Sequence, residues 1–214
     1  MLESPDVPDQ KVGMIVTELA CHGSLFDLIQ HNGAISEDIT RHYAKQLLSA
    51  VQHIHSNEVA HKDIKLENLL LDQDFNLKVA DFGLSSSISA SDRSGFEKSA
   101  FGGTPSYMAP ELHMRYPYSP QGADLFAMGV SLFVMATGRM PFVKATFDDP
   151  HYHKIATMDF TAFWKAHQKN GLVFSEEFKE LTTLMLSLQP YMRPGLADIA
   201  AHPWLTNEQV VTQE

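Results

Sequence analysis

Apolar residues recur with helical spacing after Ser36, at Ile39, Tyr43, Leu47, Val51 and Ile54. Steps of three and four positions place such residues on one face of a helix. Ser36 suits the N-cap position, since its hydroxyl can accept a hydrogen bond from a first-turn N–H. The acidic pair that follows, Glu37 and Asp38, suits the positive end of the helix dipole. The pattern therefore predicts a long amphipathic helix that begins directly after Ser36.

Two short apolar runs predict a β-hairpin, and one longer run predicts a buried helix. The runs Leu69-Leu70-Leu71 and Leu77-Lys78-Val79 flank a hairpin loop at residues 72–76. Residues 125–136 are apolar around the whole helix circumference except at Ser131, so we expect them inside the core. This run is too short to span a bilayer. Helices with one small hairpin indicate a mainly α, α+β fold.

The remaining stretches contain turn-forming residues. Residues 85–99 include seven serines and few apolar side chains, which predicts a flexible surface loop. Prolines divide the second half into several helices; they stand at Pro117, Pro120, Pro141, Pro150, Pro190 and Pro194. No internal repeat or long linker interrupts the 214 residues, so a single medium-sized domain is expected.

Composition narrows the classes of partner and compartment. The 16 basic and 26 acidic residues give a net charge of −10, which argues against nucleic acid or an anionic membrane as partner. Cys21 is the single cysteine, so an internal disulfide is excluded and a reducing, cytoplasmic location is expected. No charged-then-apolar leader opens the chain, so no signal peptide is expected.

Three polar segments follow one another with defined spacing. They are His-Lys-Asp-Ile-Lys-Leu-Glu-Asn at 61–68, Asp-Phe-Gly at 81–83, and Gly-Thr-Pro-Ser-Tyr-Met-Ala-Pro-Glu at 103–111. Asp63 can orient an acceptor hydroxyl, and Lys65 can bring an ammonium group to a phosphate. Asn68 and Asp81 offer oxygen ligands without cysteine, a set that suits Mg²⁺ better than zinc. A polar turn that merely caps a strand is the alternative, but it does not account for three segments in order.

This order resembles the catalytic loop, the metal-binding triplet and the end of the activation segment of eukaryotic protein kinases. The resemblance runs from about Met14 to Leu205, nearly the whole chain. By resemblance, Lys65 marks the serine/threonine branch. The His-Pro-Trp string at 202–204 resembles the last helix of the calcium/calmodulin-dependent and AMP-activated kinase group. The implied fold is a kinase C-terminal lobe with a β-hairpin at the catalytic loop, preceded by the last N-lobe strand and the hinge.

The resemblance implies catalytic roles for three residues and metal binding for two. Asp63 would be the base, Lys65 the cation on the phosphate side, and Thr104 the hydroxyl that bonds both. Asn68 and Asp81 would hold Mg²⁺ and, through it, ATP. The implied reaction transfers the γ-phosphoryl group of ATP to a Ser or Thr hydroxyl of a protein substrate.

Further positions are implied to bind the nucleotide. Glu18 and Ala20 would face adenine with their backbone groups, in a hinge formed by residues 14–20. Ser24 would face the ribose. Leu70 and Glu67, close to Asn68 in the sequence, are the other residues implied to bind the nucleotide. Glu67 also stands where kinases that favour basic residues near the phosphosite carry an acid.

Structural roles are implied for a second group of residues. Glu111 and Arg193 match a buried ion pair that ties the activation segment to the lower lobe. Asp124 matches a carboxylate that braces the catalytic-loop backbone, and His61 matches a buried histidine of that loop. A regulatory protein is a further expected partner.

The segment before the hinge lacks other parts of a complete kinase, which needs a glycine-rich loop, a strand lysine and a helix glutamate. Only Gly13 and Lys11 precede Thr17, in neither sequence context. We therefore expect an N-lobe remnant at 1–20, a C-lobe at 21–205 and a polar tail at 206–214, with weak or no activity for the chain alone. A truncated kinase and a lower-lobe scaffold both fit, so a non-catalytic interaction module remains the alternative.

Overall fold

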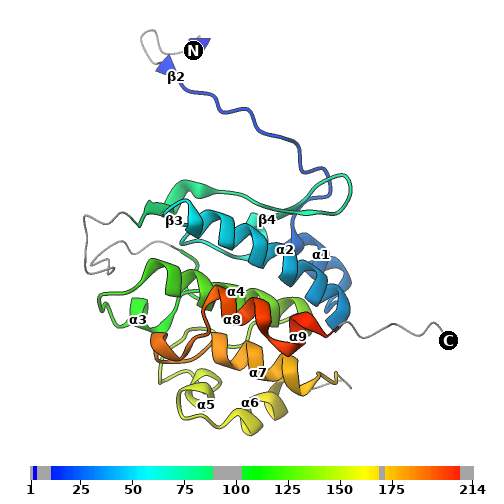
Figure 1. Ribbon diagram of the computed structural model, residues 1–214, viewed down its shortest axis with the longest axis vertical. Helices are drawn as coiled ribbons and strands as arrows, with labels where there is room; N and C mark the ends of the chain where they lie inside the picture. Colours follow the sequence, from blue (N-terminus) through cyan, green and yellow to red (C-terminus); the bar gives the residue numbers. More distant parts are fainter. Residues whose placement is uncertain (1, 4–10, 89–102, 169–171, 208–214) are drawn as a thin grey trace, which may run out of the picture.

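The computed structural model describes residues 2–3, 11–88, 103–168 and 172–207 (Figure 1). The α-helices are α1 (Leu25–Asn32), α2 (Glu37–Ser56), α3 (Pro110–His113), α4 (Pro120–Thr137), α5 (Tyr152–Ala156), α6 (Phe160–His167), α7 (Glu176–Met185), α8 (Leu196–Ala201) and α9 (Pro203–Thr206). The strands are β1 (Leu2–Glu3), β2 (Lys11–Val12), β3 (Val59–Ala60), β4 (Leu69–Leu71), β5 (Leu77–Val79) and β6 (Ser86–Ser87). Short 3₁₀ turns lie at Leu66–Asn68, Phe82–Leu84 and Pro190–Met192. The predicted mainly helical fold with small sheets is confirmed.

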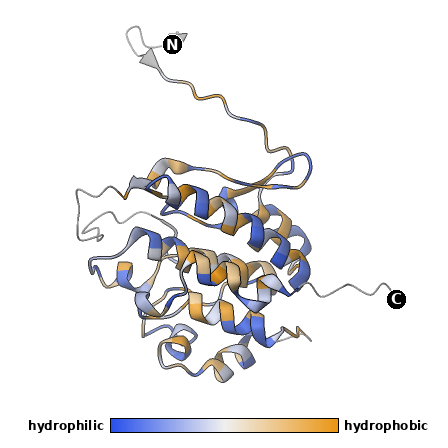
Figure 2. Cartoon of the chain, viewed as in Figure 1, coloured by the Kyte–Doolittle hydropathy of each residue, from blue (hydrophilic) through white to orange (hydrophobic). Residues whose placement is uncertain are grey.

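Helix α4 forms the centre of the body, with α2 against one side and α7 against another (Figure 1). Its side chains are buried over almost the whole length, including Ser131. The buried Ser131 hydroxyl is satisfied because Oγ donates to the Ala127 carbonyl at 2.9 Å. A Cβ placed on Gly129 would lie 2.8 Å from the Met185 Cβ, so glycine allows α4 and α7 to approach this closely. The predicted buried helix is confirmed, and Figure 2 shows its apolar colouring in the interior.

Helix α2 begins where the sequence predicts. Ser36 Oγ accepts from the Ile39 N–H at 3.3 Å, and Tyr43 and Val51 are buried as expected. Ile39 is different: it is 47% exposed, while Thr40 is fully buried. The Thr40 hydroxyl donates to the Ser36 carbonyl at 2.9 Å and so carries no unpaired polar group into the core. The first turn therefore presents a different face from the one that apolar spacing predicts.

The predicted hairpin is present, and it is tied to α2. β4 and β5 pair antiparallel with Leu69 opposite Val79, and the Leu77 N–H donates to Gln46 Oε1 at 2.7 Å. The predicted loop at 85–99 is wrong at its start, because β6 pairs with β3 and places Ser86 opposite Ala60. Backbone hydrogen bonds, which serine forms like any other residue, create this strand. Residues 89–99 lie outside the described part of the chain.

The predicted strand at the hinge is not formed. β1 and β2 pair with each other, and residues 13–20 then run to the body without helix or strand (Figure 1). A strand needs a neighbour for its N–H and C=O groups, and no described strand lies beside this segment. Ile15 and Val16 are consequently 90% and 86% exposed. Glu18 is tied to the hairpin, where its carboxylate meets Lys78 Nζ at 3.2 Å.

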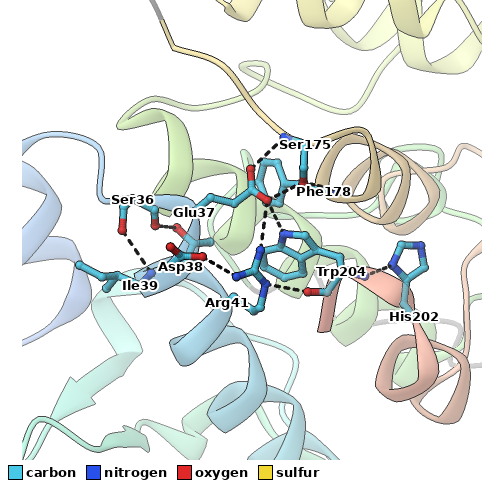
Figure 3. Close-up of polar contacts among 10 residues, drawn as sticks. Ser36, Glu37, Asp38, Ile39, Arg41, Ser175, Phe178, His202 and Trp204 are labelled. Carbon is cyan, nitrogen blue, oxygen red and sulfur yellow. Dashed lines mark hydrogen bonds and ion pairs between the residues drawn. The ribbon is translucent and has the colours of Figure 1, made fainter. Parts of the chain in front are cut away.

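A polar network joins the ends of three helices (Figure 3). Glu37, at the start of α2, accepts from the Ser175 N–H at 2.9 Å and from Trp204 Nε1 at 2.8 Å. Arg41 Nε donates to the Trp204 carbonyl at 2.7 Å. The terminal helix α9 is thereby fixed against α2 and α7. In the ranges that the structure describes, none of the helices combines the length and the apolar character needed to cross a bilayer.

His167, at the end of α6, is buried and packs on aromatic rings. It is 4% exposed, its ring lies 4.9 Å from that of Phe133, and its Nε2 has no hydrogen-bond partner. Burial, with smaller contributions from nearby His151, Arg139 and Lys154, lowers the pKa of His167 to about 4. The folded protein therefore keeps this imidazole neutral at pH values where the unfolded chain protonates it.

Acid is expected to destabilise the protein through His167. The unfolded pKa is 6.5 and the folded pKa is about 4, so the contribution of His167 to stability is fully present above pH 6.5 and is lost as the pH falls toward 4. A depression of this size corresponds to about 3 kcal/mol of unfolding free energy. Urea denaturation between pH 7 and 4 measures this loss. His167→Phe should flatten the profile if it folds, whereas His42→Gln at an exposed position should leave it unchanged.

Candidate active site

Asp124 of α4 holds the loop that carries Asp63 through two hydrogen bonds. The Asp124 carboxylate accepts from the His61 N–H at 2.9 Å and from the Lys62 N–H at 2.8 Å. Lys62 adopts a left-handed φ of 66°, which costs energy in a residue other than glycine. The two hydrogen bonds compensate for this strain and fix the direction in which the loop leaves β3. The prediction that Asp124 braces this backbone is confirmed.

His55 also helps to hold the catalytic loop, through its contact with Asp124, and no sequence motif predicts this role. Its Nε2 lies 2.9 Å from Asp124 Oδ2, and both side chains are buried, with 6% and 1% exposed. The contact joins the end of α2 to α4 across 69 positions of sequence. A histidine two residues from His53 on one helix gives no signal of such a partner, because the partner comes from tertiary packing.

His61 connects the loop to the segment that precedes Asp81. Its Nε2 donates to the Ala80 carbonyl at 3.0 Å, and its Nδ1 accepts from the Asp63 N–H at 3.2 Å. These two partners define the tautomer, because a backbone N–H can only donate and a carbonyl can only accept. The Phe82 ring packs edge-on against His61 at 4.8 Å. The predicted bracing role of His61 is confirmed.

Residues from two of the predicted segments, 61–68 and 103–111, form one polar cluster around the Asp63 carboxylate. Lys65 Nζ lies 2.7 Å from Asp63 Oδ2, and Asn68 Nδ2 donates to the same oxygen at 3.0 Å. Lys65 Nζ also donates to Thr104 Oγ1 at 3.3 Å, across 39 residues of sequence. Asp63 is 8% exposed, so these donors compensate for the burial of its charge. The arrangement orients one carboxylate and places one ammonium group beside it.

Asn68 and Asp81 are placed next to each other by the backbone. The Ala80 N–H donates to the Asn68 carbonyl at 2.9 Å, and Asp81 follows directly. Asp81 has a left-handed φ of 62°, and its Oδ1 accepts from the Gly83 N–H at 3.1 Å. Because Asn68 Nδ2 points to Asp63, the amide oxygen is the atom left to contact a cation. Two oxygen donors suit a hard cation that phosphates help to bind.

Two of the residues predicted to bind the nucleotide, Ser24 and Leu70, lie on neighbouring segments of the backbone. Leu70 is half-buried in β4 and forms a bridge with Ser24. The Ser24 hydroxyl is engaged in the N-cap of α1, donating to Asp27 Oδ2 at 2.7 Å and accepting from the Asp27 N–H. The Ser24 hydroxyl and the Ser24 N–H, which also donates to Asp27 Oδ2 at 2.9 Å, lower the pKa of Asp27. The Ser24 hydroxyl is therefore engaged with Asp27, and its ribose-facing role remains a prediction.

Glu18 and Ala20 leave their backbone groups without a described partner strand, and Glu67 is exposed on the 3₁₀ turn. The Glu18 side chain is turned to Lys78, which is compatible with a role for its backbone alone. The roles of these residues remain predictions.

Residues 104–111 form a surface beside Asp63, which we call the platform. Gly103 has φ of 121°, a backbone conformation that residues with a side chain rarely adopt, so glycine suits this position. Tyr107 is 7% exposed, and burial raises the pKa of its hydroxyl, which is therefore neutral. The platform thus contacts the catalytic loop through buried neutral groups.

Glu111 and Arg193 fix the end of this platform. Arg193 donates from both terminal nitrogens to the two Glu111 oxygens at 2.7 Å each, and its side chain is 0% exposed. Arg193 Nε also donates to the Ser187 carbonyl at 3.1 Å, and the guanidinium lies 5.0 Å from the Phe126 ring centroid. The predicted buried ion pair is confirmed.

Comparison with known proteins agrees with this geometry. Residues 6–205 match the protein kinase domain family. The chain belongs to the protein kinase family. The match begins at residue 6 and does not divide an N-lobe remnant from a C-lobe, so that division remains a prediction for this kinase domain.

The most similar relatives include serine/threonine kinases. CBL-interacting protein kinase 29 of rice (Oryza sativa subsp. japonica) is 40% identical over 90% of this kinase domain's chain, which covers 40% of the rice protein. Human NUAK family SNF1-like kinase 2 is 36% identical over 90% of the chain and 28% of its own length. Human testis-specific serine/threonine-protein kinase 1 is 35% identical over 89% of the chain and 50% of its own length. The assignment to the serine/threonine kinases of the calcium/calmodulin-dependent and AMP-activated group is confirmed, and the chain spans half or less of these relatives.

Proposed function

We propose that this chain forms the catalytic and substrate-binding part of a serine/threonine protein kinase. The observation that carries the proposal is the cluster at Asp63, where Lys65, Asn68 and Thr104 converge within 3.3 Å contacts. A polar turn that only caps a strand has no need of a buried lysine bonded to both a carboxylate and a distant threonine. Transfer of the γ-phosphoryl group of ATP needs alignment and charge stabilisation, and this cluster can supply both.

In the proposed mechanism, Asp63 orients the hydroxyl of the protein substrate. Its Oδ2 accepts from Lys65 and Asn68, which leaves Oδ1, on the Gly103 side, for the acceptor hydroxyl. Lys65 holds its ammonium group beside the transferring phosphate, and Thr104 keeps the lysine in position. As the hydroxyl oxygen bonds to the γ-phosphorus, the bond from that phosphorus to the β,γ-bridging oxygen breaks, ADP leaves, and Asp63 receives the hydroxyl proton.

Asn68 and Asp81 are the proposed ligands of Mg²⁺. Their two oxygens are hard donors, and the left-handed turn at Asp81 fixes the carboxylate through the Gly83 N–H. When bound, Mg²⁺ would neutralise negative charge on the phosphate oxygens of ATP. Glu18, Ala20, Ser24, Leu70 and Glu67 are proposed to line the nucleotide side of the site.

The 214 residues by themselves are proposed to bind ATP weakly. Residues 1–17 contain neither a glycine-rich loop nor a strand lysine in a Val-Ala-Ile-Lys context. Both parts hold the phosphates in this family, so we infer that residues 1–20 are a remnant of the upper lobe and residues 21–205 the lower lobe. The exposed apolar side chains at 14–16 support this division, because they suit a sheet that would cover them.

A protein substrate and a regulatory protein are the proposed partners. Two rice relatives are named as CBL-interacting kinases, which supports a regulatory partner for this kinase as well. A cytoplasmic location is proposed because Cys21 is the single cysteine of the chain.

The proposal is tested on the full-length natural protein with ATP, Mg²⁺ and peptides that differ only in a Ser, Thr or Tyr acceptor. Labelled phosphate is expected on the Ser and Thr peptides and not on the Tyr peptide, and removal of Mg²⁺ with EDTA should abolish transfer. Absence of transfer to every peptide, combined with binding to another kinase or its substrate, would instead favour a non-catalytic interaction module.

A further inference from the structure

A cavity of about 600 Å³ lies between α6 and α7, two helices at the base of the body in Figure 1. Protein cavities that bind small organic molecules commonly have volumes of about 300–1,000 Å³. None of the described residues that line this cavity belongs to the cluster at Asp63 or to the residues predicted to bind the nucleotide. The α6–α7 cavity is therefore a second place on this domain where a ligand can be held.

The floor of the α6–α7 cavity is apolar, because its polar atoms already have partners. Trp164 Nε1 donates to Thr183 Oγ1 at 3.0 Å, and the Thr183 hydroxyl donates to a backbone carbonyl of α7 at 2.5 Å. The Trp164 ring lies 5.5 Å from that of Phe133 in α4, so the core fixes its position. Phe160, which is 36% exposed, and Leu184 extend this surface. The floor thus suits the apolar body of a ligand.

Helix α6 places three hydrogen-bond donors along the rim of the cavity. Thr161, Lys165 and Gln168 all line it, and their spacing of four and three residues puts them on one face of the helix. Their hydroxyl, ammonium and amide groups can all donate to an anion. Lys165 is exposed and forms no ion pair with any residue that the structure describes. Helix α6 therefore presents a row of donors beside the aromatic floor.

The carboxylates that α7 contributes to the cavity have partners of their own. Glu176 Oε1 lies 2.7 Å from Lys179 Nζ, so these two charges compensate each other. Glu180 Oε2 lies 3.9 Å from Nε2 of His202, which directly precedes α9, so this carboxylate is turned toward His202 and not toward α6. Among the charged side chains described at the cavity, Lys165 is the one without such a partner. The local charge consequently favours an anionic group on the α6 side.

We propose that the α6–α7 cavity binds a small amphiphilic anion, with its apolar body on Phe160 and Trp164 and its carboxylate or sulfonate at Lys165. The inference goes beyond the proposed kinase function, because binding here needs neither ATP nor phosphoryl transfer. An aromatic side chain that anchors a ligand commonly contributes about tenfold in affinity, and an exposed ion pair contributes up to about fivefold. Both contributions are measurable by substitution.

The test uses the full-length natural protein and the fluorescent probe anilinonaphthalene sulfonate, an aromatic body with one anionic group. Two competitors displace the probe: dodecanoate, and dodecyltrimethylammonium, which has the same alkyl chain and the opposite charge. Both are kept below the concentrations at which they form micelles. Dodecanoate is expected to displace the probe about fivefold more effectively. The 214 residues carry a net charge of −10, so non-specific adsorption to this domain would instead favour the cation.

Substitutions at the cavity locate the bound anion. Lys165→Gln should weaken dodecanoate binding about fivefold and remove the preference for the anion, and Phe160→Ala should weaken it about tenfold. Thr161→Trp, which fills the cavity from an exposed position, should abolish displacement. The matched controls are Lys45→Gln, at an exposed lysine of α2, and Phe26→Ala, which is 39% exposed on α1. Both controls should bind dodecanoate like the wild type, and urea denaturation checks that every variant is folded.

Three results would overturn the proposal. They are failure of dodecanoate to displace the probe, equal displacement by the cationic competitor, and wild-type affinity for dodecanoate in the folded Lys165→Gln, Phe160→Ala and Thr161→Trp variants. The readout is independent of phosphoryl transfer, so the α6–α7 cavity stands or falls separately from the kinase activity.

Discussion

Replacement of Asp63 by Asn is expected to lower kcat of the full-length protein about 10²- to 10⁴-fold, the usual contribution of a positioned base. An amide at this position cannot take the acceptor proton. Its oxygen can still accept from Lys65 Nζ and Asn68 Nδ2, which lie 2.7 and 3.0 Å from Asp63 Oδ2. The surrounding geometry should therefore survive, and KM for ATP should change little. Steady-state kinetics with a saturating Ser peptide measures the effect.

The control for this substitution is Asp74→Asn, in the exposed loop of the hairpin. It makes the same chemical change at a position outside the cluster, and kcat should equal that of the wild type. Urea denaturation of both variants separates loss of chemistry from loss of folding. A wild-type turnover number for Asp63→Asn in a folded protein would exclude Asp63 as the base.

Replacement of Arg193 by Leu is expected to cost about 3–5 kcal/mol of unfolding free energy, the usual loss when one partner of a buried ion pair is removed. Glu111, with 7% of its side chain exposed, would keep a charge without its two hydrogen-bond donors. The Ser187 and Gly122 carbonyls would lose their donor as well. Domains of this size are stable by only about 5–15 kcal/mol, so urea denaturation should show a large shift of the midpoint.

Two further variants separate charge from shape at this pair. Arg193→Lys keeps the charge and loses the bidentate fork, so an intermediate loss is expected. Glu111→Leu combined with Arg193→Leu leaves no unpaired charge, so it should be more stable than Arg193→Leu alone. Glu176→Gln, which breaks the surface contact with Lys179, is the control and should have a much smaller effect. Equal losses for the buried and surface pairs would contradict the structural role of Glu111 and Arg193.

Local sequence determined the elements whose stabilising contacts are local. Ser36 and the apolar repeat after it specify α2, because capping and helical spacing act within one or two turns. The hairpin of β4 and β5 follows from two apolar runs and a short polar loop. The apolar run at 125–136, interrupted only by Ser131, specifies a helix buried on all sides. The order of the motifs along the chain is enough to predict that Asp63, Lys65, Asn68 and Thr104 act together.

Only the tertiary structure decided features that depend on a distant partner. Thr40 is buried in place of Ile39 because the packing direction of α2 is set by its neighbours and not by its own pattern. His55 reaches Asp124 across 69 residues, a contact that no local pattern encodes. Ser86 and Ser87 form a strand because β3 supplies backbone partners, and residues 13–20 form none because no described strand lies beside them. Hydrogen bonds between distant backbone segments and the burial of one helix against another are properties of the folded chain as a whole.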